Sequence, residues 1–286
     1  MKWVLLASLL GVGAWAQSSA LASPHRLTLA STHLSEPLQA EVHLPGDYSV
    51  SPTRRYPLCL LLHGAGSSAA DLRSLGLAEL ATQYQIIIVA PDAGRSLFVD
   101  SIGAGDHLES ALLQDLLPEL DRRFRTQGTR QGRMLAGLSF GGFAALHLGM
   151  LHPERFALVA SLSGVVGAPR WSAAEEALLP PEMRLQMRMA FGLPGSVTRS
   201  QKDLFAGIST LSPKARKALP FLALECGTED IFLPANRRFA NLLESQSIPH
   251  EFSATHGKHD GEFWGRRLDE VLRLRAHRSE LATTPE

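Results

Sequence analysis

Apolar and polar positions follow two different patterns along the chain. Residues 25–32 and 38–44 alternate between the two kinds, as half-exposed strands do. Later segments are continuous apolar runs, which are typical of strands covered on both faces. In chain order these runs are LCLLLHG, QIIIVAPD, RMLAGLS, FALVASLSG and FLALECGTED, and HEFSATHG follows as a further core strand.

Segments of helical character lie between the buried runs, at residues 69–83, 107–124, 140–151, 234–245 and 261–277. The repeated order of strand, helix and strand predicts an α/β fold: a mostly parallel central sheet with helices on both faces. The two alternating strands would form an antiparallel N-terminal edge. We find no linker that divides the chain, so we expect residues 23–280 to form a single domain.

Residues 165–219 depart from this order. They contain paired prolines and several glycines among amphipathic pieces such as EEALLPPEMRLQMRMAF. We expect this segment to be an excursion between two core strands. It would add packing to the core, form a cap over a site, or do both.

The first 22 residues have the pattern of a secretory signal peptide. Lys2 supplies a positive start, an apolar run follows, and A-x-A sites end at Ala16 and Ala22. A membrane anchor is the alternative, but the apolar run is shorter than the roughly 20 residues that span a bilayer. We therefore expect an exported protein, periplasmic or extracellular, without stable membrane insertion.

Charge and cysteine content narrow the expected partners. Lys plus Arg and Asp plus Glu number 28 each among 286 residues, so the formal net charge is zero and gives no reason to expect nucleic acid as a partner. Cys59 and Cys226 both lie inside apolar runs, where we expect buried free thiols rather than a disulfide framework. The sequence does not indicate an oligomeric state.

The strongest chemical signal is the segment GLSFG, with Ser139 at its centre. It joins an apolar strand to a helix, which is the arrangement of a nucleophile elbow. A serine there stands at the carboxyl edge of the sheet, and the free N–H groups of the following helix favour a developing anion.

A serine hydroxyl needs a base, and the base needs an orienting acid. In this architecture the chain order is serine, acid, histidine. Glu229 and Asp230 follow one late strand, while His256 and His259 lie at and beyond the end of the next. Both pairs fall on the same sheet edge as Ser139, and the residues alone leave each choice open.

An acyl transfer also needs donors for its oxyanion. The segment LLHGAG ends an apolar strand with two glycines, so its backbone can approach a ligand closely. The expected donors are the N–H groups of Ala65, or of Gly64, and of Phe140.

Together these motifs resemble the esterase family of α/β-hydrolases, which includes esterase D (S-formylglutathione hydrolase), feruloyl esterases, small acyl esterases and mycolyl transferases. The resemblance covers nearly all of the chain after the leader. The segments that carry it are RRYPLCLLLHGAG, IIIVAPDAGRSLFVDS, LLQDLLPELDRRFRT, GLSFGGFAAL, CGTEDIFLPANRRFANLL and HGKHDGEFW.

The resemblance implies Asp230 as the acid and His259, followed by Asp260 and then Trp264, as the base. Many relatives carry an aromatic residue where this chain has Gly261. This difference affects the expected shape of the acyl or alcohol pocket and not the expected triad. It also implies substrate contacts in the GRSLFVDS loop, with Asp100 and Ser101 as candidates. His63 and Gly64 are further candidates for substrate contact.

We therefore expect a serine carboxylesterase that acts on a small-molecule or glycan-linked ester through an acyl-enzyme. No metal or other cofactor is expected, because no zinc-type histidine spacing appears on a helix. Acyl transfer to a sugar or lipid hydroxyl is the alternative within the enzyme class. A hydrolase fold without activity, serving as a binding protein, is the alternative of another class.

Overall fold

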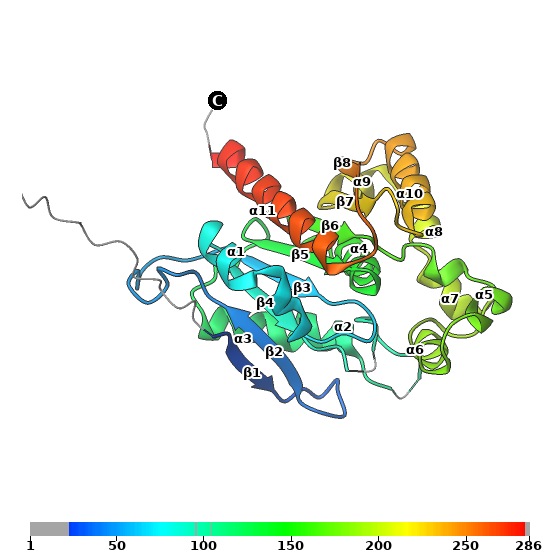
Figure 1. Ribbon diagram of the computed structural model, residues 1–286, viewed down its shortest axis with the longest axis horizontal. Coiled ribbons are helices and arrows are strands. Elements are labelled where there is room, and N and C mark those ends of the chain that lie inside the picture. Colours follow the sequence, from blue (N-terminus) through cyan, green and yellow to red (C-terminus); the bar gives the residue numbers. More distant parts are fainter. Residues whose placement is uncertain (1–22, 95, 104, 284–286) are drawn as a thin grey trace, which may run out of the picture.

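The computed structural model describes residues 23–94, 96–103 and 105–283, so the expected signal peptide lies outside the described residues. Its centre is an eight-stranded sheet in the order β1-β2-β4-β3-β5-β6-β7-β8 (Figure 1). The strands are β1 (His25–Leu29), β2 (Leu38–His43), β3 (Leu58–Leu62), β4 (Ile87–Pro91), β5 (Arg133–Leu138), β6 (Leu158–Leu162), β7 (Phe221–Gly227) and β8 (His250–Thr255).

The strand directions confirm the predicted sheet. β1 pairs with β2 and β2 with β4 in antiparallel register, whereas β3 to β8 are all parallel to one another. Each predicted strand is present. The parallel strands therefore place all their carboxyl ends on one edge of the sheet, which is the edge expected to carry the site.

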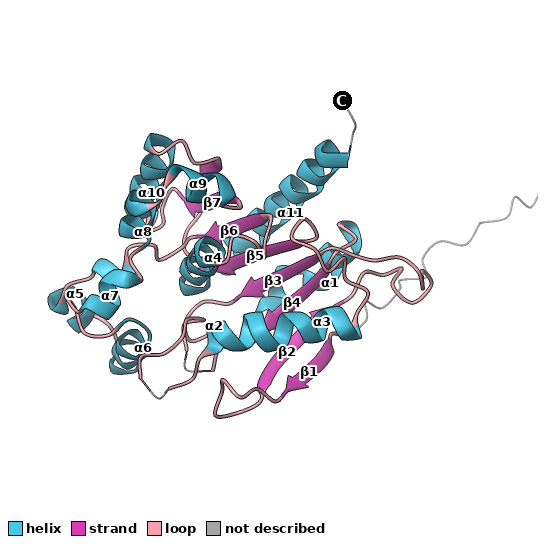
Figure 2. Cartoon of the chain, turned by 180° about the vertical axis from the view of Figure 1, so that it is seen from behind, coloured by secondary structure: helices cyan, strands magenta, loops and turns pink. Residues whose placement is uncertain are grey.

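Two layers of helices cover the sheet. One face carries η1 (Asp71–Leu75), α1 (Leu77–Gln83) and α11 (Gly261–Thr283), in front in Figure 1. The other carries α2 (Leu108–Ser110), η2 (Ala111–Leu116), α3 (Leu117–Arg123), α4 (Phe140–Leu151) and α10 (Leu233–Ser245), in front in Figure 2. Alternate residues of the buried strands face the two layers, so Leu60 and Leu61 enter different core clusters.

One helix prediction was wrong in its extent. Residues 69–83 form a 3₁₀-helix and an α-helix rather than one helix. Gly76 separates them because it adopts a left-handed conformation (φ 74°) that ends the first and begins the second. The expected helix 107–124 is a continuous run from Leu108 to Arg123 whose middle, η2, has π-helical hydrogen bonding.

Residues 165–219 lie between β6 and β7, as expected for an excursion. They form η3 (Ala168–Arg170), α5 (Ala173–Ala177), α6 (Pro181–Phe191), α7 (Val197–Gln201), α8 (Leu204–Thr210) and α9 (Pro213–Ala218). Phe191 packs edge-on against Phe143 of α4, and Phe205 packs against Phe239 of α10. Much of this segment therefore extends the core.

A buried ion pair ties the excursion together. Arg199 and Glu176 are each 1% exposed and contact each other directly. Arg199 also donates to the backbone oxygens of Ala168 (3.0 Å) and Pro169 (2.8 Å). Since a buried charge is tolerated only when it is paired and hydrogen-bonded, this arginine connects α5, α7 and η3.

Both cysteines are free and buried in the structure. Burial raises the pKa of the Cys59 thiol to about 12, which keeps it protonated. No helix of the described residues is long and apolar enough to cross a membrane.

Candidate active site

Ser139 stands at the sharp turn between β5 and α4. Its backbone has φ 56° and ψ −118°, a conformation that costs a non-glycine residue about 1–3 kcal/mol. Three main-chain hydrogen bonds hold it there: Ser139 N–H donates to Leu162 O (2.9 Å), and its carbonyl accepts from Phe143 N–H and Val165 N–H (both 3.1 Å). The ends of β5 and β6 and the start of α4 therefore fix the serine together.

The glycines around Ser139 are required by close backbone contacts. A Cβ on Gly137 would lie 2.0 Å from Gly141 O, and a Cβ on Gly141 would lie 2.3 Å from Leu62 O. Real Cβ atoms do not approach backbone oxygens so closely. The spacing of glycines about the serine thus permits β5, α4 and the end of β3 to meet at one point.

A chain of hydrogen bonds joins Ser139, His259 and Asp230. The Ser139 hydroxyl lies 2.9 Å from His259 Nε2, and His259 Nδ1 lies 2.9 Å from Asp230 Oδ2. In the tautomer that fits this chain, Nδ1–H donates to the carboxylate and Nε2 accepts from the hydroxyl. The three residues follow β5, β8 and β7 at the carboxyl edge of the sheet.

Asp230 is held as a carboxylate. Its side chain is buried, and burial alone would raise the pKa of this carboxyl, but hydrogen bonds from His259 and from Phe232 N–H (2.8 Å) lower the pKa below its usual value. Both carboxylate oxygens are therefore used, one for the imidazole and one for the turn that begins α10.

The two candidate acids and the two candidate bases lie in different surroundings in the structure. Glu229 and His256 contact each other at 3.2 Å on the surface, where the His256 side chain is 85% exposed. Asp230 and His259 instead face Ser139. Asp260 lies beside His259 but accepts from Phe263 N–H (3.0 Å) at the start of α11.

The glycine loop after β3 adjoins the serine. A Cβ on Gly64 would lie 3.3 Å from Ser139 Cβ and 3.8 Å from its Oγ, so this backbone packs directly against the nucleophile candidate. Ala65, Phe140, Gly64 and His63 all line one small hollow of about 10 Å³. Phe140 N–H is at the first position of α4, where no preceding turn offers it an acceptor.

His63 has a different place from the one expected for a substrate contact. It is 3% exposed, its Nδ1–H donates to Gly64 O (2.7 Å), and its Nε2 accepts from Ala93 N–H (3.1 Å). Burial lowers the pKa of this imidazole, which suits the neutral ring that both bonds require. His63 therefore fixes the glycine loop, and neither ring nitrogen is left for a ligand.

Asp100 and Ser101 are not brought to the triad residues. The carboxylate of Asp100 accepts from Ser110 N–H (3.0 Å) and Ser110 Oγ (2.7 Å), and Ser101 N–H donates to Asp106 O (3.0 Å). Among the contacts of the described residues, none joins either side chain to Ser139, His259 or Asp230. Their interactions organise the loop before α2.

Aromatic side chains surround the histidine, and sequence reasoning missed one of the aromatic residues at this site, Trp171. Phe232 and Trp264 each contact the His259 ring edge-on, with centroids 5.0 Å away. Trp171, from the excursion, stacks on Phe232 and meets Phe140 edge-on, both at 6.3 Å. The position of Phe232, two residues after Asp230, could have indicated from the sequence that it lies at the site. Nothing in the local sequence pattern indicates this for Trp171. The excursion therefore also contributes a wall to the site.

The sheet, the elbow and the residues that converge on it define the class of α/β-hydrolases. The family described as "Putative esterase" matches residues 31–274. The chain belongs to this family of esterases.

Individual relatives agree with this assignment. The chain is 24% identical to the acetyl esterase of Caldicellulosiruptor saccharolyticus over 73% of its own length and 79% of that protein. It is 30% identical to Esterase Rv1288 of Mycobacterium tuberculosis over 76% of its length, but it spans only 51% of that relative. A solved ferulic acid esterase shares the fold, with a TM-score of 0.77, 23% identity and coverage of 89% of this chain and 97% of that one.

Proposed function

We propose that this protein is an exported serine carboxylesterase that works through an acyl-enzyme. Ser139 attacks the ester carbonyl while Nε2 of His259 takes its proton, and Asp230 fixes the imidazole tautomer and stabilises its charged form. The observation that carries the proposal is the hydrogen-bond chain from Ser139 Oγ to His259 and Asp230, with both distances at 2.9 Å.

The oxyanion that forms in this attack is stabilised by the N–H groups of Phe140 and Ala65. Two observations support this role: Phe140 and Ala65 line the same small hollow, and Gly64, which also lines it, packs against Ser139. Each such donor contributes about 3–4 kcal/mol to transition-state stabilisation. His63 acts as a positioning residue here, because its two hydrogen bonds hold the loop that presents Ala65.

The tetrahedral intermediate then collapses: the ester C–O bond breaks, His259 gives its proton to the departing alcohol, and the acyl group stays on Ser139 Oγ. Water next hydrolyses this acyl-enzyme. His259 removes a proton from the water as it attacks, and it returns the proton to Ser139 Oγ when the acid leaves. The cycle requires no metal and no organic cofactor.

The substrate is a carboxylic ester on a small molecule or a glycan. The wall formed by Trp171 and Phe232 supports an apolar acyl or alcohol group next to the scissile bond. The relatives named acetyl esterase and ferulic acid esterase point to acyl groups from acetyl to cinnamoyl size.

Export rests on the leader-like pattern of residues 1–22. Expression of the full chain in a secreting host and N-terminal sequencing of the product test it. Cleavage after Ala16 or Ala22 supports export, and an intact start in the cytoplasm contradicts it.

The activity is tested with p-nitrophenyl esters of increasing acyl length. Wild type should hydrolyse the shorter esters, and Ser139→Ala and His259→Ala should each lose about four to six orders of magnitude in kcat. His256→Ala serves as the matched control and should retain activity. Wild-type turnover in Ser139→Ala would contradict the mechanism.

A further inference from the structure

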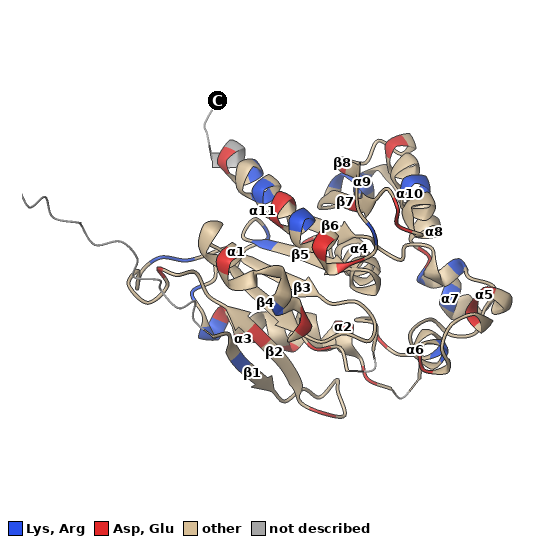
Figure 3. Cartoon of the chain, viewed as in Figure 1, with Lys and Arg blue, Asp and Glu red and all other residues tan. Residues whose placement is uncertain are grey.

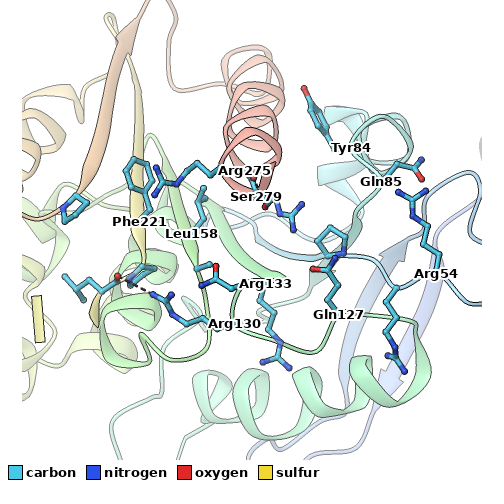
Figure 4. Close-up of a pocket in the computed structure, with 18 of the residues that line it drawn as sticks. Arg54, Tyr84, Gln85, Gln127, Arg130, Arg133, Leu158, Phe221, Arg275 and Ser279 are labelled. Carbon is cyan, nitrogen blue, oxygen red and sulfur yellow. Dashed lines mark hydrogen bonds between the residues drawn. The ribbon is translucent and has the colours of Figure 1, made fainter. Parts of the chain in front are cut away.

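A large cavity lies at the opposite edge of the sheet from the ester site. Its volume is about 810 Å³, and it is lined by residues at the amino ends of the parallel strands, among them Pro57, Arg133 and Phe221 (Figure 4). Arg133 begins β5 and Ser139 follows the other end. At about 3.3 Å per residue the two sites are separated by about 20 Å along the strand.

The cavity is strongly basic although the whole chain has no net charge. Among its described lining residues there is no Asp or Glu, whereas seven are Lys or Arg. These seven residues come from distant parts of the sequence: the loop before β3, the loop before β5, the first residue of β5, helix α9 and helix α11. In Figure 3 basic positions recur along α11 and at the amino end of β5.

Within the part of the chain that the structure describes, most of these cations have no carboxylate partner. Arg54 pairs with Asp47 at 3.0 Å, and Arg133 pairs with Asp121. The remaining five have no carboxylate within ion-pair distance among the described residues; they are Arg55, Arg130, Lys217, Arg275 and Arg278. The cavity therefore concentrates positive charge that the described part of the protein does not neutralise.

Neutral groups hold several of these guanidinium groups in place. Arg130 Nε donates to Pro153 O (2.8 Å), Arg55 donates to Thr126 O (2.9 Å), and Arg278 lies 3.7 Å above the Phe221 ring. Such contacts fix a charge in position and leave it free to meet an anion.

In the inner part of the cavity, Arg275 likewise has no carboxylate partner among the described residues. Arg275 is half-buried, and burial lowers the pKa of its guanidinium. No hydrogen bond or ion pair of its side chain is recorded with the described residues. Arg133 Nε is buried without a hydrogen-bond partner among the described residues, although another nitrogen of the same guanidinium pairs with Asp121. A desolvated cation without a partner costs free energy, and an anion in the cavity would offset that cost.

We propose that this cavity binds a compact polyanion with clustered phosphate or carboxylate groups, with Arg275 and Arg133 as inner contacts and Lys217, Arg55 and Arg278 at the rim. The volume falls within the range of small-molecule sites, roughly 300–1,000 Å³. The planar guanidinium fork matches both kinds of oxyanion. This site is separate from the ester site. Ligand binding there does not require the reaction at Ser139.

The test is calorimetric titration of the purified mature protein with tripolyphosphate and, separately, with citrate at constant ionic strength. Wild type should bind at least one of them, and the stronger ligand distinguishes a phosphate site from a carboxylate site. Arg275→Met should weaken binding at least tenfold. Without any anion it should also raise the Tm, because it removes a half-buried charge that has no ion-pair partner among the described residues.

Two further variants keep the test decisive if Arg275→Met does not fold. Lys217→Ala on exposed α9 should weaken binding several-fold, and Arg238→Gln on the exposed face of α10 should leave it unchanged. Failure of both anions to bind wild type would overturn the proposal. Equal binding by wild type, Lys217→Ala and Arg275→Met would overturn it as well. Neither readout depends on ester hydrolysis.

Discussion

The hydroxyl of Ser139 lies 2.9 Å from Nε2 of His259, although 120 residues separate the two in the chain. The parallel sheet makes this contact possible, because β5 and β8 end at the same edge and each residue follows its strand closely. Asp230 completes the set from the end of β7, which lies between β5 and β8 in the sheet. The proposed chemistry thus depends on strand order more than on any local motif.

The role of Asp230 can be separated from that of its neighbour in sequence. Asp230→Asn keeps the shape of the side chain but no longer fixes the His259 tautomer, so kcat should fall by about 10⁴-fold. Glu229→Gln is the matched control, because Glu229 contacts His256 at the surface, and it should keep nearly full activity. Steady-state kinetics with a p-nitrophenyl ester measure both. Equal losses in the two variants would contradict the assignment of the acid.

The elbow glycines should tolerate no side chain. Gly141→Ala places a methyl group 2.3 Å from Leu62 O and 2.5 Å from His63 O, so we expect a loss of about 3 kcal/mol or more in the free energy of unfolding. Gly261→Ala, which meets open space at the start of α11, should instead gain about 0.5–1 kcal/mol. Urea unfolding compares the two. A Gly141→Ala variant as stable as wild type would show that the tight turn is not required.

Stability should decrease between mildly acidic and mildly alkaline pH because of Glu225. Burial, and also the nearby Glu251 and Glu270, raise the pKa of this carboxyl to about 7, against the opposing effect of Arg267. The folded state therefore holds a proton that the unfolded state releases near pH 4.5. The stability from this proton is present below about pH 4.5 and is lost as the pH rises through 7, by up to about 3 kcal/mol.

Urea unfolding at pH 5, 6, 7 and 8 measures this dependence. Glu225→Gln should flatten the curve over this range, while Glu244→Gln on the exposed face of α10 should reproduce the wild-type slope. If wild type and Glu225→Gln decline in parallel, the pKa of Glu225 is not raised.

The buried pair in the excursion should respond strongly to the loss of one partner. Glu176→Gln leaves Arg199 charged and 1% exposed, which should destabilise the protein by about 3–5 kcal/mol. Arg170→Gln removes a partly exposed pair with Asp203 at 2.8 Å and should cost less than about 1 kcal/mol. Thermal unfolding and limited proteolysis within residues 165–219 report both effects. Equal, small effects would mean that the buried pair does not anchor the segment.

Sequence patterns predicted the sheet well, since buried parallel strands are continuous apolar runs and half-exposed strands alternate. Periodicity failed at Gly76, because a single left-handed residue ends a helix without disturbing the apolar spacing around it. The choice of Asp230 and His259 over Glu229 and His256 depends on which side chains turn inward after β7 and β8. Local sequence does not encode that direction.

Features that combine residues from distant segments could not be predicted from the sequence. Trp171 reaches the site only because the excursion folds back over Phe140 and Phe232. The basic cavity likewise gathers residues from Arg54 to Arg278, which appear in the sequence as scattered surface charges in a neutral chain. In both cases tertiary packing creates the feature.

The central claim is that Ser139 is the nucleophile, and covalent labelling tests it most directly. The protein is treated with a fluorophosphonate, digested, and the modified residue is located by mass spectrometry. We predict a single adduct on Ser139 that is absent from Ser139→Ala and much slower to form in His259→Ala. An adduct on another residue, or unchanged labelling of folded Ser139→Ala, would contradict the proposed mechanism.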